Sequence, residues 1–99
     1  MTVEQRIHNY IWQRKSEIVD TLKALIKIPS VKGEAKEKAP FGAACAEALS
    51  YTKKLYESYG FATEADTEGG YLLSYFGKGE KALGLFAHAD VVPDRKSVV

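Results

Sequence analysis

The stretch Ala82-Leu83-Gly84-Leu85-Phe86-Ala87-His88-Ala89-Asp90-Val91-Val92-Pro93 is the most informative part of this 99-residue sequence. Its first six residues form a continuous apolar run, which is typical of a β-strand buried on both faces. Side chains two residues apart lie on the same side of an extended segment, so His88 and Asp90 should project together. In open α/β sheets, ligand sites form where strands end. The stretch therefore predicts a buried strand that delivers this pair to a site.

The residue types at the end of the run suit a metal site. A neutral imidazole is a common zinc ligand, and a nearby carboxylate can fix its tautomer and ring orientation. The spacing alone leaves a second interpretation open. His88 and Asp90 could equally lie in a strand-to-loop turn in which local hydrogen bonds satisfy both side chains.

The residues before this stretch predict two helices. Thr2 and Gln5 have the spacing of a capping box, which should begin a helix that runs to about Ile28. Pro29 disfavours helical geometry in the residue before it. The helical spacing has one weak turn, around residues 14 and 15. It predicts one buried apolar stripe: Val3, Ile7, Ile11, Ile18, Leu22 and Leu25.

A mostly polar stretch, residues 30–40, predicts a surface loop. A second helix is expected over residues 42–59, with Gly60 as its left-handed C-terminal cap and Cys45 as a small inward-facing hydrophobe. The pattern then favours two strands, 61–66 and 71–76, joined as a hairpin. The predicted fold class is therefore α/β: two N-terminal helices, a β-hairpin and a buried strand.

Composition excludes several classes of function. The formal net charge is +1 and the lysines are interleaved with glutamates, so we expect no nucleic-acid partner. A single cysteine excludes an intramolecular disulfide. No apolar run approaches the roughly 20 residues of a membrane span. Because no signal peptide is visible either, the predicted location is the cytoplasm.

The motif also resembles a known family. Residues 85–93 resemble the first metal-ligand motif of the M20 zinc metallopeptidases, and Leu25-Ile26-Lys27-Ile28-Pro29-Ser30-Val31 looks like that family's opening segment. The helix leading to Tyr59-Gly60-Phe61 follows in the family's order. Ala39-Pro40-Phe41-Gly42 and the Gly77-Lys78-Gly79 turn look most like the PepV-type dipeptidase branch. The resemblance covers about residues 5–93. It implies that residues 1–93 are the start of a zinc-peptidase-type α/β catalytic domain.

The resemblance implies a role for each residue of the pair. His88 would bind one ion of a two-zinc site, and Asp90 would be the catalytic-site carboxylate that orients the imidazole. The family's other ligands and its glutamate general base would lie downstream of this motif. The implied substrates are dipeptides. Alternatives are an N-acyl amino-acid deacylase of the acetylornithine or succinyl-diaminopimelate type, or a non-catalytic α/β module in which His88 and Asp90 are structural.

The sequence departs from the family pattern after Pro93. Residues 94–99 are therefore expected to be a tail foreign to the family, at a truncation. Because catalytic zinc usually needs three protein ligands, we expect the 99-residue chain to be inactive alone. The second histidine, His8, is expected to be an ordinary helical surface residue. The sequence leaves open whether the complete enzyme is a monomer or a homodimer.

Overall fold

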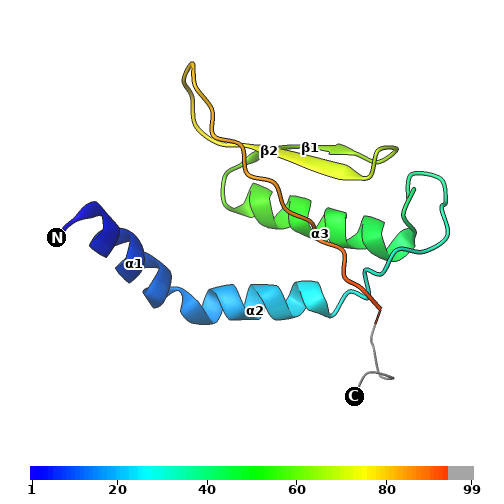
Figure 1. The fold of residues 1–99 in the computed structure, drawn as a ribbon, viewed down its shortest axis with the longest axis horizontal. Helices are drawn as coiled ribbons and strands as arrows, with labels where there is room; N and C mark the ends of the chain where they lie inside the picture. Colours follow the sequence, from blue (N-terminus) through cyan, green and yellow to red (C-terminus); the bar gives the residue numbers. More distant parts are fainter. Residues whose placement is uncertain (94–99) are drawn as a thin grey trace.

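A computed structural model describes residues 1–93, with three helices followed by one hairpin (Figure 1). The helices are α1 (Val3–Gln13), α2 (Lys15–Ile26) and α3 (Ala43–Ser58), and the strands are β1 (Ala62–Asp66) and β2 (Tyr71–Tyr75). The mixed α/β class is confirmed. The predicted foreign tail, 94–99, lies outside the described residues.

The predicted first helix is in fact two helices. The capping box at its start is confirmed, since the Gln5 N–H donates to Thr2 Oγ1 at 3.1 Å and the Thr2 N–H donates to Gln5 Oε1 at 2.8 Å. The helix breaks at Arg14, whose φ of −103° and ψ of 14° are not helical. The Arg14 guanidinium lies 4.3 Å from the centre of the Tyr10 ring and 3.2 Å from Glu17. These contacts hold the break at the turn where the apolar spacing is weakest.

The prediction of a buried stripe on this helix is wrong. No residue of α1 or α2 is buried, and Ile7 and Leu22 are 55% and 53% exposed. The reason is architectural, because within residues 1–93 α2 touches α3 only sparingly and no element covers α1 (Figure 1). Four of the stripe's six apolar side chains instead line an open groove: Ile11, Ile18, Leu22 and Leu25.

Helix α3 ends as its sequence predicts. Gly60 has a φ of +90°, its N–H donates to the Glu57 carbonyl, and the next N–H, of Phe61, donates to the Tyr56 carbonyl. This is the Schellman arrangement, with the usual hydrophobic contact between Phe61 and Tyr56, whose ring centres are 5.3 Å apart. The cap reverses the chain so that the hairpin folds back onto the helix.

The hairpin prediction is also confirmed. β1 and β2 pair antiparallel, from Ala62 opposite Tyr75 to Asp66 opposite Tyr71. Asp66 organises the turn, since its side chain accepts the Gly69 N–H at 2.7 Å and its carbonyl accepts the Gly70 N–H. Both strands pack on α3, so α2, α3 and the hairpin are stacked in that order (Figure 1).

The buried strand predicted over 82–87 is not formed. The segment makes no backbone hydrogen bond to another part of residues 1–93. Leu83, Leu85 and Phe86 are 86%, 87% and 99% exposed. An apolar strand needs partners on its edges and faces, and the described residues supply none. Its composition nevertheless stays that of a strand interior.

The chain buries little apolar surface of its own. Its accessible surface is 8756 Å², against about 5,600 Å² for a compact monomer of this mass. Among residues 1–93 only two apolar residues, Ala39 and Ala48, are buried. No helix in the described part of the chain is both long and apolar enough to cross a membrane.

Candidate metal-binding segment

The structure brings His88 and Asp90 together. Nδ1 of His88 lies 3.0 Å from Asp90 Oδ1 and 3.1 Å from the Asp90 carbonyl oxygen. A proton on Nδ1 can be donated to these acceptors, and the lone pair then resides on Nε2. The two side chains are 82% and 55% exposed, so Nε2 is accessible. This is the arrangement that a histidine binding metal through Nε2 requires.

The backbone beside this pair is attached to the end of α2, far away in sequence. Ser30 Oγ donates to the Ala89 carbonyl at 3.1 Å, and the Val91 N–H donates to the Ser30 carbonyl at 3.1 Å. Figure 1 shows the segment running from the hairpin toward this point. The predicted surface loop over 30–40 therefore needs correction at two positions, because Ser30 and Ala39 are buried.

Cys45 lies next to the same point. Its Sγ is 3.4 Å from the Ser30 carbonyl, and the residue is partly buried. The expected inward position of this cysteine agrees with that contact. The thiol belongs to the packing around Ser30 and is not part of the His88–Asp90 pair.

The described residues hold one candidate ligand, not a complete metal site. Nowhere in residues 1–93 do three His, Cys, Asp or Glu side chains come together as a group able to hold an ion. The donor chemistry of His88 with its carboxylate partner fits zinc. A catalytic zinc ion would need further ligands from other residues.

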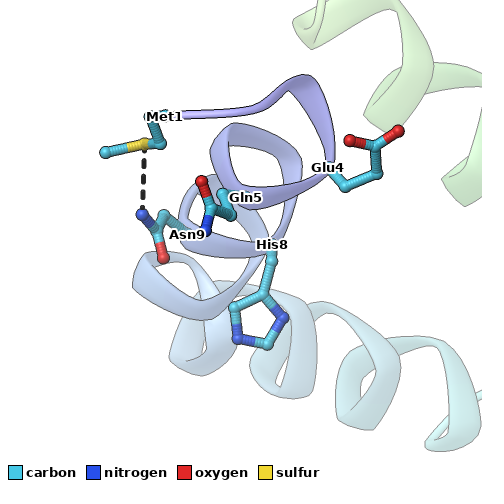
Figure 2. A pocket seen from close by; sticks show the side chains of 5 residues that line it. All are labelled: Met1, Glu4, Gln5, His8 and Asn9. Atoms are coloured by element: carbon cyan, nitrogen blue, oxygen red, sulfur yellow. Dashed lines mark hydrogen bonds between the residues drawn. The ribbon is translucent and has the colours of Figure 1, made fainter.

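The second histidine lies elsewhere. His8 borders a shallow hollow of about 450 Å³ on α1, lined by Met1, Glu4, Gln5, His8 and Asn9 (Figure 2). Figure 2 shows its ring pointing away from the contact between Met1 and Asn9. The imidazole is stacked near Trp12, with ring centres 6.2 Å apart. His8 is an exposed helical residue, as predicted.

A larger apolar groove of about 610 Å³ lies between α1, α2, α3 and the residues that flank the hairpin, Phe61 and Phe76. Tyr59 closes one side, donating its hydroxyl hydrogen to Glu17 Oε1 at 2.6 Å. This hydrogen bond, followed by that from Arg14, holds the pKa of Glu17 below its usual value. The same bond to Glu17 raises the pKa of Tyr59. Neither this groove nor the hollow on α1 includes His88 or Asp90.

Comparison with curated proteins finds relatives that are named as dipeptidases. A protein from Staphylococcus aureus strain USA300, named a "putative dipeptidase", is 37% identical over 86 residues, which is 84% of this chain. A Staphylococcus haemolyticus protein of the same name is 34% identical over 91 residues, again 84% of the chain. This chain is similar to dipeptidases.

The similarity covers a small part of those proteins. The chain matches 18% of the S. aureus protein and 19% of the S. haemolyticus protein. No family model matches the sequence, and no solved structure matches it. The resemblance to dipeptidases is thus observed, whereas the M20 class and the zinc dependence remain predictions.

The sequence-based interpretation missed Ser30. The sequence places it in a polar stretch after a proline, which favours an exposed loop. Its partner Ala89 is 59 residues away, and no periodicity or spacing links the two positions.

Proposed function

We propose that this chain carries the first metal-binding segment of a zinc-dependent dipeptidase of the M20, PepV-like type. His88 serves as a ligand to one zinc ion through Nε2, and Asp90 orients its ring. Residues 1–93 form the start of the catalytic domain, which acts in the cytoplasm on dipeptides.

One observation carries this proposal. The Nδ1 of His88 faces the Asp90 carboxylate at 3.0 Å while the rest of the imidazole is open to solvent. A buried pair with all its polar atoms satisfied would have favoured the structural interpretation. The dipeptidase names of the relatives favour a dipeptide substrate over an N-acyl amino acid.

Zinc, when bound, would activate a water molecule and polarise the scissile carbonyl. This chain's own contribution is narrower. Asp90 accepts the Nδ1 proton and so keeps the Nε2 lone pair directed outward, which should raise the affinity of His88 for the ion. The general base and the other ligands are not assigned to any residue of this chain.

A chimaera tests the ligand role. Residues 1–93 would replace the matching segment of the S. aureus relative, and zinc content and dipeptide hydrolysis would be measured together. His88→Ala should lower both, since removing orienting groups alone changes metal affinity or activity by about 10- to 100-fold. His8→Ala, the control, should change neither. Zinc content that is unaltered by His88→Ala would refute the ligand role.

The 99-residue chain alone should not hydrolyse dipeptides. One histidine cannot hold a catalytic zinc ion, which usually has three protein ligands. The test is an assay of the purified chain with added zinc and a panel of dipeptides. Hydrolysis that disappears with a chelator would contradict this expectation.

The enzyme proposal and the alternative of a non-catalytic module differ in what they predict for the DNA downstream of codon 93. If the enzyme proposal holds, the DNA downstream of codon 93 should encode, in some frame, an aspartate at a helix start and a Glu-Glu pair. DNA without that coding potential would favour the module.

A further inference from the structure

Ser30 is the largest fully buried side chain in the described part of the chain, at 1% exposure. It follows Pro29 at the end of α2, where the backbone makes two tight turns. The Ser30 N–H donates to the Ile28 carbonyl at 2.7 Å, and the Val31 N–H donates to the Pro29 carbonyl at 2.8 Å. The Ser30 amide is therefore engaged locally and is not free to pair with another segment.

The hydroxyl takes the place of that amide. Ser30 Oγ donates to the Ala89 carbonyl while the Ser30 carbonyl accepts the Val91 N–H, both at 3.1 Å. These two bonds hold the backbone on either side of Asp90. They resemble one step of a strand ladder in which a side-chain hydroxyl replaces the missing backbone donor.

This clamp is the structural restraint nearest to the pair. Between Phe76 and Ala89 the chain makes no backbone hydrogen bond to the rest of residues 1–93, and most of its side chains are exposed. With Ala89 and Val91 bonded on one side, His88 and Asp90 project together on alternate positions. The clamp thus fixes the extended backbone on which the 3.0 Å contact between their side chains depends.

We propose that Ser30 is a positioning residue: its hydroxyl and carbonyl fix the backbone around Asp90 and thereby orient His88 toward its metal ion. The orienting of His88 for a metal rests on the proposed function, whereas the clamp itself does not. Alanine would leave the Ala89 carbonyl without its donor. Threonine would keep the hydroxyl.

The test uses the isotopically labelled 99-residue chain without metal, in four forms. Ser30→Ala removes the hydroxyl, Ser30→Thr retains it, and Cys45→Ala removes the side-chain contact to the Ser30 carbonyl. Asp90→Ala provides the reference spectrum for a His88 ring that lacks its carboxylate partner. Two readings are taken: amide exchange at Val91 and the ¹⁵N shift of His88 Nδ1. Amides of β1 and β2 report the fold.

Ser30→Ala should speed Val91 exchange about fivefold, the effect of losing a typical hydrogen bond. Its His88 Nδ1 signal should move toward that of Asp90→Ala, while the strand amides stay unchanged. Ser30→Thr and Cys45→Ala should stay within about twofold of the wild type. If Ser30→Thr changed Val91 exchange and the His88 Nδ1 signal as much as Ser30→Ala does, the role of the hydroxyl would be overturned. A general loss of strand protection in Ser30→Ala would also overturn the proposal, because Ser30 would then serve the fold as a whole.

Zinc content of the chimaera separates this inference from the proposed function. If His88→Ala lowers zinc content and Ser30→Ala does not, the positioning role is wrong and the ligand role stands. If neither lowers it, the proposed function fails, although the metal-free readings can still demonstrate the clamp. A fall with both variants, together with the altered Nδ1 signal, supports the inference.

Discussion

Two segments of this chain have the sequence pattern of β-strands, but only one of them pairs. The strands β1 and β2, residues 62–75, find each other across a four-residue turn and pack on α3. The run 82–87 is more apolar than either strand, yet it pairs with nothing in residues 1–93 and its side chains are exposed. The difference is one of contact range. The hairpin needs only neighbours within about 30 residues, whereas a strand buried on both faces needs partners from distant parts of a chain.

The junction before α3 is where we expect the largest effect of a substitution. Gly42 has a φ of +100°, and a Cβ there would lie 3.0 Å from the Gly33 Cα and backbone nitrogen. Gly42→Ala should destabilise the α3–hairpin region by about 3 kcal/mol, from backbone strain together with the close contact to the Gly33 backbone. Urea unfolding followed by circular dichroism would measure this loss.

Gly60→Ala is the matched control for that substitution. Gly60 also has a positive φ, +90°, but a Cβ there would meet nothing within 4 Å. Gly60→Ala should therefore lower the unfolding free energy only by the backbone strain, about 1 kcal/mol. Equal losses at the two glycines would mean that the close approach of Gly42 to Gly33 is unimportant.

The packed centre of α3 should show the next effect. Ala48 is 1% exposed, and Ala48→Leu should cost about 2 kcal/mol by overpacking. Ala43→Leu places the same side chain on an exposed position of the same helix and should be nearly neutral. If Ala48→Leu were also neutral, the hairpin would not be tightly packed on α3, and it would differ less from the run 82–87 than the structure indicates.

Acid should weaken the hairpin turn through Asp66. The Gly69 N–H, and then the Tyr71 hydroxyl, hold the pKa of Asp66 below its usual value. A lowered folded-state pKa means that the stabilisation is present above the unfolded pKa of about 3.9 and is lost as the pH falls through the folded value. Asp66→Asn should therefore reduce the pH dependence of unfolding below about pH 4.

A second carboxylate of β1 provides the control for that titration. Glu64→Gln removes a carboxylate that makes no side-chain hydrogen bond within residues 1–93. The acid-dependent change in unfolding midpoint should persist in this variant. An Asp66→Asn profile identical to the wild type would show that the turn does not depend on this carboxylate.

What the sequence could predict follows the same division by contact range. The capping box at Thr2, the cap at Gly60 and the hairpin depend on residues close together in the sequence, and all three are confirmed. The pairing of His88 with Asp90 is local too, and the structure brings the two side chains into contact. Contacts between residues close in the sequence can be predicted because backbone geometry fixes which nearby side chains can meet.

The errors concern contacts over long distances or their absence. The apolar pattern predicts burial of the α1–α2 stripe and of residues 82–87. It indicates which side chains suit a buried position, but it does not show whether another element covers them. The break at Arg14 adds a local exception, since contacts to Tyr10 and Glu17 stabilise a non-helical residue. Ser30 was missed because its bond to Ala89 spans 59 positions.

The smallest predicted effect is the sharpest test of the comparison. Leu85 is 87% exposed, so Leu85→Ala should change the unfolding free energy of this chain by less than about 0.5 kcal/mol. In a strand buried on both faces, the same substitution would cost about 2–5 kcal/mol. The chimaera with the S. aureus relative provides that second context, and thermal unfolding of both proteins would measure the difference. A large loss in the chimaera alone would show that the apolar run is a strand whose partners lie in the remainder of the protein. A large loss of unfolding free energy in the 99-residue chain would instead mean that Leu85 is packed there, and the run 82–87 would then not differ from the hairpin in this respect.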